Sequence, residues 1–370
     1  MKRTPPAGSR SFDRAQGRPF DRAQGGPFDR AQGRPNPDRL LELIDTFAGI
    51  RVAVFGDLIV DEFIYGQISR VSREAPVLIL EYDSTEIVPG GAGNAANNVA
   101  ALGGRALALG VAGDDEQGSR LLDVLGRTVD SAHVVRSTVM KTPTKTRILA
   151  GGVHSAKQQV VRIDRAARSP MSDADRKAIE VRLNAAMARC QALIVSDYGS
   201  GLVTPALVAG ARRRLRGPGR RQPPVLVDSR HSLLEFRNMS ACTPNESEVE
   251  QLFGTKIGED VRVLEKAGRD ILTRTKAEAV LITRGSRGMA LFQPKQETLH
   301  IPIYGSDQIA DVTGAGDTVI ATMTLTLAAG GTFEEAARLA NYAGGLVVMK
   351  RGTATVTADE LRNAVASDRG

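Results

Sequence analysis

From residue 51 onward, short apolar runs alternate with longer amphipathic segments. The apolar runs have the length of strands and begin at residues 51, 105, 192, 224 and 279. Apolar residues recur with a helical period over residues 173–189, 204–216, 259–274 and 333–348. Repeated strand and helix units of this kind predict an α/β fold, in which a large, mostly parallel sheet is flanked by helices on both faces.

Two stretches break this alternation. Residues 63–91 and 144–164 have the pattern of strands without intervening helices, and Gly151 and Gly152 give a turn signal in the second stretch. We expect these stretches, from about 63–90 and 134–164, to form a small β-sheet that projects from the α/β body. Such a sheet is suited to be a lid over a site or a dimer surface.

The N-terminal segment has a different composition from the rest of the 370 residues. The hexapeptide FDRAQG begins at residues 12, 20 and 28, and residues 1–37 carry eight basic and three acidic side chains. A segment rich in Gly, Pro and Arg buries too little to offset its ordering entropy, so we expect a disordered basic tail at 1–37 and one folded domain at 38–370. Most of the net charge of +7 therefore lies in the tail. Without a basic helix, zinc finger or aromatic platform elsewhere, we expect no specific nucleic-acid partner.

Cysteine and histidine usage excludes other classes of protein. Cys190 and Cys242 are far apart, and the four histidines are scattered singly, which gives neither a disulfide framework nor a zinc-ligand spacing. Apolar runs long enough for a membrane span and a signal peptide are both missing from the sequence. We expect a reduced, cytoplasmic protein with no membrane association and no structural metal.

The glycine-rich segment at residues 89–104, PGGAGNAANNVAALGG, permits three interpretations. Gly91, Gly93 and Ala96 formally match a dinucleotide-binding fingerprint, but Pro89 interrupts the run that should precede it. Alternatively, the glycines allow a sharp turn and the alanines allow close helix packing. In the third interpretation, Asn94 and Asn98, spaced i and i+4 on one helix face, recognise a polyol. A Walker A motif is not found in the sequence.

The segment DVTGAGD, residues 311–317, can supply phosphate handling instead. Gly314 and Gly316 permit an exposed turn, after which the free backbone N–H groups of a new helix attract an anion. Such fixed donors stabilise a phosphoryl group in transfer, and Asp317 in the first turn can accept the proton of an attacking hydroxyl as general base. The alternative is that Asp311 or Asp317 merely caps the helix.

Four motifs in this order resemble those of the ribokinase-like (PfkB) carbohydrate kinases over about residues 50–365. The first motif comprises Gly56, Asp57 and Asp61, followed by Gly90, Gly91 and Asn94. The second is Asn245 with Glu248, the third is the turn TRGSRG at 283–288, and the fourth is DVTGAGD. The resemblance implies a kinase that uses ATP and Mg2+, and in some relatives a monovalent cation such as K+. It also implies that the small sheet forms a homodimer contact.

The resemblance assigns roles to residues. It makes Asp317 the catalytic base and the amides of Gly314, Ala315 and Gly316 an anion hole. Sugar hydroxyls would be held by Asp61 and Asn94 beside Gly90 and Gly91. Glu248 would hold magnesium through water, and the nucleotide would contact a set of cofactor-binding residues: Asn245, Glu248, Thr283, Gly285, Gly288, Asp311, Thr313 and Asn341. A solvated helix face is the alternative for Glu248.

Within the family, longer stretches are similar to the kinases of D-glycero-D-manno-heptose 7-phosphate in lipopolysaccharide-precursor synthesis. These stretches are residues 56–81, 197–204 and 311–357. The implied acceptor carries a phosphate, for which Lys145, Arg147 and Arg162 are candidate ligands, although each can equally be an ordinary exposed cation.

The chain also departs from that pattern. Ser200 and Arg230 stand where those kinases carry lysines, and Arg73 replaces a proline. Another sugar or sugar phosphate is therefore the alternative acceptor, and an inactive sugar- or nucleotide-binding regulator is a third possibility. An H-x-G-H nucleotidyltransferase motif is not found in the sequence, so we expect the kinase step alone.

Overall fold

The computed structural model describes residues 36–151, 157–166, 171–214, 222–305, 313–350 and 352–368. The first described element is the helix α1 (Pro37–Asp45), which is capped by the side chain of Asn36. Its apolar face, with Leu40, Leu43 and Ile44, is buried in the core. The predicted tail lies outside the described residues except for its last two, which cap and start this helix.

One eight-stranded sheet forms the centre of the fold, with the strand order β14-β13-β12-β11-β10-β9-β1-β4. Its strands β12, β13 and β14 pair antiparallel, and all the other pairs are parallel. The strands are β1 (Arg51–Gly56), β4 (Arg105–Leu109), β9 (Ala192–Asp197), β10 (Val225–Ser229), β11 (Ala241–Cys242), β12 (Ala279–Thr283), β13 (Met289–Phe292) and β14 (Leu299–Ile301).

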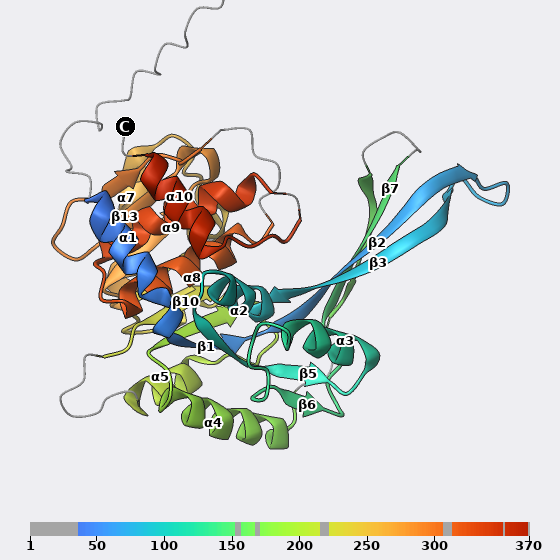
Figure 1. The fold of residues 1–370 in the computed structure, drawn as a ribbon, viewed down its shortest axis with the longest axis horizontal. Coiled ribbons are helices and arrows are strands. Elements are labelled where there is room, and N and C mark those ends of the chain that lie inside the picture. The colour runs from blue at the N-terminus through green and yellow to red at the C-terminus, as the bar shows by residue number, and fades with distance from the viewer. Residues whose placement is uncertain are drawn as a thin grey trace, which may run out of the picture. The chain divides into compact units, whose positions relative to one another are not determined.

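Helices cover both faces of this sheet (Figure 1). Alternate side chains of β1 enter opposite cores, Val52 and Val54 on one face and Ala53 and Phe55 on the other. The first face packs against α1, α2 (Ala92–Ala101), α3 (Glu116–Leu125), α8 (Ala315–Ala328), α9 (Phe333–Val348) and α10 (Ala358–Ser367). The second face packs against α4 (Asp173–Met187), α5 (Pro205–Arg214), α6 (Glu246–Phe253) and α7 (Val261–Thr275).

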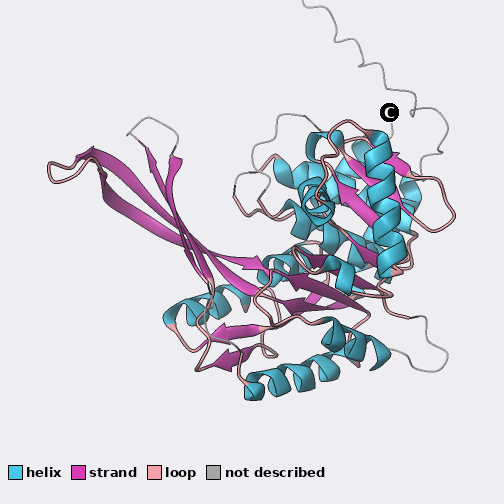
Figure 2. Ribbon diagram, turned by 180° about the vertical axis from the view of Figure 1, so that it is seen from behind, coloured by secondary structure: helices cyan, strands magenta, loops and turns pink. Residues whose placement is uncertain are grey.

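A separate four-stranded sheet extends away from these helices as an arm (Figures 1 and 2). Its strand order is β3-β2-β7-β8, in which β2 and β7 are parallel and the other pairs are antiparallel. These strands are β2 (Leu58–Val71), β3 (Leu78–Gly91), β7 (Thr144–Gly151) and β8 (Gln158–Arg165). We call this sheet the arm. The base of the arm joins the body where β2 follows β1 and β3 leads into α2.

The second segment expected in the small sheet, 134–164, is only partly within the arm. Residues Val135–Ser137 form β6, which pairs with β5 (Val111–Gly113) in a two-stranded sheet. Val134 and Val135 are buried among the apolar side chains of the body, which is why this stretch does not extend into the solvent-exposed arm.

The predicted fold class is confirmed: a large, mostly parallel sheet is flanked by helices on both faces and accompanied by a small sheet. Strands buried on both faces explain the continuous apolar runs in the sequence. Among the helices of the described residues, none has the length and apolar character needed to cross a membrane.

Candidate active site

The N-terminus of α8 is open at the first turn. Gly314 precedes the helix with a φ of 80°, and no side chain in the described part of the chain caps it. By contrast, α6, α9 and α10 each begin with a capping box. A Cβ on Gly314 would meet Nδ2 of Asn94 at 2.6 Å, so glycine is required both for the left-handed backbone and for the close approach. The free N–H groups of this turn are therefore available to an anion.

Buried hydrogen bonds connect Asp317 to two asparagines of α2. Its Oδ2 accepts a hydrogen bond of 2.6 Å from Nδ2 of Asn94. Nδ2 of Asn98 donates to Oδ1 of Asn94 at 3.2 Å, and Oδ1 of Asn98 accepts from the hydroxyl of Thr318 at 2.7 Å. Both asparagines are buried, Asn94 at 2% and Asn98 at 0% exposure; Asn94 contacts Asp317 directly, whereas the amide of Asn98 bonds to Asn94 and Thr318. The helix-capping alternative for Asp317 is wrong, since Gly314 is the N-cap.

Burial moves the titration of the Asp317 carboxyl toward neutral pH. Burial raises the pKa of its carboxyl to about 7, against the opposing effects of the Asn94 hydrogen bond and the Arg230 charge. Only 6% of the residue is exposed. A carboxylate with a pKa close to the working pH is both ionised and basic enough to accept a proton.

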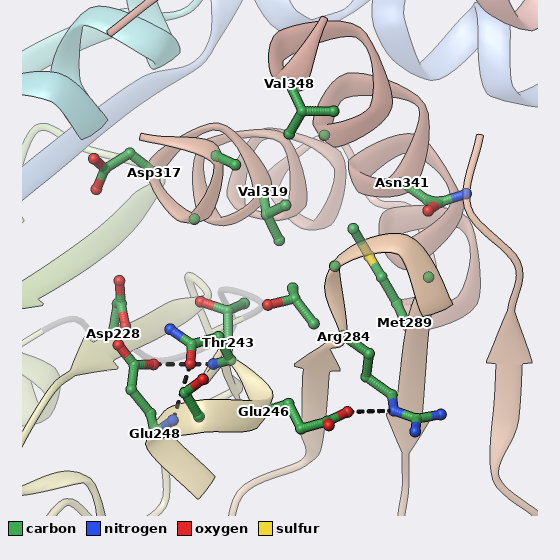
Figure 3. A pocket seen from close by; sticks show the side chains of 18 of the residues that line it. Asp228, Thr243, Glu246, Glu248, Arg284, Met289, Asp317, Val319, Asn341 and Val348 are labelled. Carbon is green, nitrogen blue, oxygen red and sulfur yellow. Dashed lines mark hydrogen bonds and ion pairs between the residues drawn. The ribbon is translucent and has the colours of Figure 1, made fainter. Parts of the chain in front are cut away.

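A cavity of about 570 Å3 opens beside the first turn of α8. Gly314, Ala315, Gly316 and Asp317 all line it. Figure 3 shows Asp317 and Asp228 at one end of this cavity, with Asn341 and Met289 toward the other. Apolar side chains also contribute to the lining: Met289, Ile303, Val319 and Val348. The carboxylates of Asp317 and Asp228 make the first end polar, which suits the phosphates of a nucleotide, and the apolar side chains of the lining suit its base.

The polar end carries a surplus of carboxylates. Asp228, at the end of β10, faces the same cavity as Glu248 on α6 (Figure 3). Burial, followed by the negative charges of Glu248 and Asp317, raises the pKa of Asp228 well above its usual range. In the described residues, three or more carboxylate, histidine or cysteine groups do not gather into a direct metal cluster. The pair of carboxylates fits a hydrated divalent cation, because magnesium retains its waters and takes few protein oxygens.

Residues 283–288 form the turn expected on the nucleotide side. Thr283 ends β12, while Gly285 and Gly288 have φ values of 57° and 75°; all three line the cavity. The turn is fixed by Glu246, which accepts from Nε of Arg284 at 2.8 Å and from Arg287. The sequence motifs did not predict a role for Glu246, Arg284 or Arg287 in the site.

Asn341 and Asn245 also line the cavity, but both have structural partners. Nδ2 of Asn341 donates to the carbonyl oxygen of Pro302 at 2.9 Å. Asn245 is the N-cap of α6, and Oε2 of Glu248 accepts from its backbone N–H at 2.9 Å. Glu248 thus has a capping contact as well as a cavity position, and both interpretations of it are compatible with the structure.

The residues expected to bind the acceptor lie at the base of the arm and not in the lining of the cavity. Asp61 is buried, and its Oδ1 accepts from Arg147 at 2.5 Å. A Cβ on Gly90 would lie 2.2 Å from Oδ2 of Asp61, so glycine makes room for this carboxylate. Gly91, with a φ of 57°, is the N-cap of α2, the helix that carries Asn94. Because α2 follows the antiparallel strand β3, the dinucleotide-fingerprint interpretation is wrong.

Positive charge surrounds the residues expected to bind the acceptor. Nζ of Lys145 lies 5.2 Å from the centre of the Tyr198 ring, and the Arg230 guanidinium lies 4.3 Å from the same ring. Arg162 faces Arg147 across the β7 and β8 pair and forms an ion pair of 2.7 Å with Asp164. Burial and the neighbouring arginines, Arg230 first among them, lower the pKa of Lys145.

Ser200 does not leave a gap where the family's lysine is expected. Its hydroxyl donates to Asp57, which also accepts from the backbone N–H groups of Tyr198 at 2.8 Å and of Ser200 at 3.2 Å. These contacts fix the loop that carries the Tyr198 ring. Of the other predicted residues, Thr313 directly precedes Gly314, and Asp311 lies outside the described residues.

Comparisons with known proteins identify relatives of this chain. The pfkB family carbohydrate kinase domain matches residues 51–360. The chain is 39% identical over 323 residues to the bifunctional protein HldE of Geobacter sulfurreducens, a match that covers 87% of this chain and 64% of that protein. It is 38% identical over 336 residues to HldE of Caulobacter vibrioides, with 90% and 67% covered. The chain thus spans about two thirds of the length of these relatives.

Solved structures share the fold at low sequence identity. Phosphofructokinase-2 from Escherichia coli, in complex with fructose-6-phosphate, superposes with a TM-score of 0.67 at 20% identity, covering 86% of this chain and 98% of that one. Ribokinase from Arabidopsis thaliana, complexed with ribose and ATP, gives 0.62 at 20% identity, with 86% and 98% covered. The family match over most of the chain, the relatives and the shared fold lead to one conclusion: this protein belongs to the pfkB family of carbohydrate kinases.

Proposed function

We propose that the protein transfers the γ-phosphate of ATP to the anomeric hydroxyl of D-glycero-D-manno-heptose 7-phosphate, giving the 1,7-bisphosphate. The observation that carries the kinase chemistry is the position of Asp317 beside the uncapped N-terminus of α8, at the polar end of the nucleotide-sized cavity. The similarity to the HldE proteins over most of the chain supports heptose 7-phosphate as acceptor. We place this reaction in the cytoplasm, where ATP is supplied.

In this proposal, Asp317 accepts the proton of the sugar hydroxyl while the hydroxyl oxygen bonds to the γ-phosphorus. The bond between that phosphorus and the bridging oxygen breaks, and its electron pair leaves with ADP. The N–H groups of Gly314, Ala315 and Gly316 stabilise the charge on the transferred oxygens without having to reorganise. Asn94 holds the Asp317 carboxylate in place through the 2.6 Å hydrogen bond.

Glu248 and Asp228 would hold magnesium through its waters, and the ion would neutralise the triphosphate charge. The carboxylate surplus at this end of the cavity supports that assignment. We also propose that the enzyme requires potassium, because the structure of Escherichia coli phosphofructokinase-2, which shares the fold, is a complex with potassium. Replacing KCl by tetramethylammonium chloride tests it, and equal rates in both salts would reject it.

The acceptor is proposed to bind between Asp61 and Asn94, with its phosphate toward Lys145, Arg147 and Arg162. Desolvated cations bind phosphate well, and Lys145 is partly buried among other cations. The test is a panel of acceptors incubated with the purified protein, ATP and magnesium: heptose 7-phosphate, fructose 6-phosphate, ribose and unphosphorylated heptose. Preferred turnover of heptose 7-phosphate supports the proposal. Preference for another member of the panel selects the alternative of a different sugar kinase, and no turnover of any acceptor selects the inactive regulator.

We also propose that the arm forms a homodimer contact. Apolar side chains stand exposed on it, among them Val71, Tyr82 and Val161, which are 59%, 67% and 47% exposed. Large exposed apolar side chains gathered on one element are typical of interaction surfaces. Light scattering of the wild type and of the variant Tyr82→Asp tests this, with a dimer expected for the first and a shift toward monomer for the second.

A further inference from the structure

Arg230 occupies a distinctive position among the cations of the site. It follows β10 directly, and its backbone N–H donates to the carbonyl oxygen of Asp197 at 3.1 Å. Its side chain lines the cavity together with Asp317 and the first turn of α8. Its charge opposes the rise in the pKa of both Asp317 and Asp228, so the guanidinium lies within electrostatic reach of both carboxylates.

The other cavity-lining arginines already have carboxylate partners. Arg284 and Arg287 both bind Glu246. At the base of the arm, Arg147 binds Asp61 and Arg162 binds Asp164. For Arg230, the described part of the chain offers neither a side-chain hydrogen bond nor an ion pair, and its guanidinium lies over the Tyr198 ring. A guanidinium has five N–H donors, and here they remain available to a ligand.

Tyr198 acts as a platform for this guanidinium. The ring lies 4.3 Å from Arg230 and 5.2 Å from Nζ of Lys145. Asp57 fixes the backbone of Tyr198, so the platform is rigid. Two cations that share one ring repel each other, and an anionic group placed beside them relieves that repulsion. Arg230 lines the cavity that we assign to the nucleotide, and Lys145 lies among the residues that we assign to the sugar. An anion bound between these two cations would therefore lie between the nucleotide and the sugar.

We propose that Arg230 binds the phosphoryl group while it moves from the nucleotide to the acceptor hydroxyl, opposite the amides of Gly314–Gly316. This inference rests on the proposed kinase function and adds a catalytic residue to it. As the bond from phosphorus to the bridging oxygen breaks and the bond to the sugar oxygen forms, the hydroxyl proton passes to Asp317. Arg230 transfers no proton; it donates hydrogen bonds to the equatorial oxygens, on which negative charge is spread.

Steady-state kinetics of Arg230→Gln and Arg230→Lys test this role. We expect kcat of Arg230→Gln to fall by about 100- to 1,000-fold, because cations at a transferring phosphoryl group contribute at least this much. The KM of the acceptor should change less than about threefold, and Arg230→Lys should recover part of the loss. Guanidinium chloride at millimolar concentration should partly restore Arg230→Gly. The exposed Arg237→Gln is the matched control and should keep wild-type kinetics.

The same variants distinguish this role from binding of the acceptor's own phosphate. If Arg230 binds the transferred group, the fall in kcat is the same for phosphorylated and unphosphorylated acceptors. A rise in KM confined to phosphorylated acceptors, or an unchanged kcat, overturns the proposal.

A second measurement does not depend on knowing the acceptor. ADP, magnesium and aluminium fluoride imitate the phosphoryl group in transfer, and thermal stabilisation by this mixture beyond that by ADP and magnesium should be lost in Arg230→Gln and retained in Arg237→Gln. An Arg230-dependent stabilisation in a protein that turns over no acceptor would reject the proposed reaction but uphold this inference. Equal stabilisation of both variants, or none in the wild type, would overturn it.

Discussion

Asn94 and Asp317, separated by 223 residues in the chain, are joined by a buried hydrogen bond of 2.6 Å. This bond links α2, which we propose faces the acceptor, to Asp317 in the first turn of α8, which we propose is the base. It also favours the ionised carboxylate, and so it limits the rise in the pKa of Asp317 that burial causes.

Removal of the Asn94 amide should shift the pH dependence of catalysis. In Asn94→Ala, the pKa of Asp317 should rise above its value of about 7, because the donor that stabilises the carboxylate is lost. The alkaline shift is measured as the midpoint of kcat/KM between pH 5.5 and 9. Asn97→Ala on the same helix, whose partner is Thr128, is the matched control and should leave the midpoint in place. Coincident profiles for all three proteins would show that this bond does not tune the base.

Burial of the Asp317 carboxylate should also lower the free energy of unfolding as pH rises. The folded pKa of Asp317, about 7, lies above its ordinary value of 3.8, so the folded state holds the proton more tightly. The penalty is absent below about pH 4, grows as pH rises and is complete above about pH 7. Asp317→Asn removes it, so the melting temperature of this variant relative to wild type should increase more at pH 8 than at pH 5. Equal differences at the two pH values would indicate that the carboxyl is not strained by burial.

Gly316 provides a test of the anion site that leaves the fold intact. A Cβ at this position meets no atom within 4 Å and would project into space beside the cavity, so Gly316→Ala should fold normally. Because the methyl group would lie beside the amides that we propose bind the transferred phosphoryl group, kcat should fall by roughly 10-fold or more. Gly210→Ala on α5, also a helical glycine with little around it, is the control and should keep its kcat.

Gly90 should control the acceptor side without affecting the nucleotide. A Cβ there would lie 2.2 Å from Oδ2 of Asp61, so Gly90→Ala must displace that carboxylate. We expect the KM of the acceptor to rise about 10-fold or more while the KM of ATP stays the same. Gly49→Ala, where a Cβ meets nothing within 4 Å, is the control. A parallel rise in both KM values would contradict the assignment of Asp61 to the acceptor.

The N-terminal boundary can be located by truncation. Deletion of residues 1–35 retains the Asn36 cap and α1, and we expect unchanged stability and turnover. Deletion of residues 1–46 also removes Leu40, Leu43 and Ile44 from the core, which should cost roughly 5 kcal/mol of unfolding free energy. Urea denaturation of both proteins measures the difference. Loss of soluble protein from the shorter deletion would show that the repeats contribute to folding.

The fold was predictable because its signals are local. The run over residues 52–55 is apolar throughout, as a strand buried on both faces requires, and the entrance of α8 follows from Gly314 before the helix and Gly316 in its first turn. The strand β6 was harder to assign, because its residues have the pattern of the arm but are buried in the body.

The site was predictable in its residue types but not in its pairings. Asp317 and Asn94 both carry motif signals, yet their hydrogen bond depends on the packing of α2 against α8. The Tyr198 platform and the Glu246 bridge to Arg284 bring together residues with no common spacing in the chain. The proximity of Asp228 to Glu248 likewise arises where β10 ends beside α6. Such contacts follow from tertiary structure, and a sequence pattern can only suggest that the strand end is a good position for them.

The central claim, that Asp317 accepts the proton of the acceptor hydroxyl, is tested most directly by the rate of phosphoryl transfer in Asp317→Asn. With saturating acceptor, ATP and magnesium in a single turnover, we expect this rate to fall by roughly 100-fold or more, while the dissociation constant of ATP stays within about twofold. A transfer rate equal to that of the wild type would contradict the account.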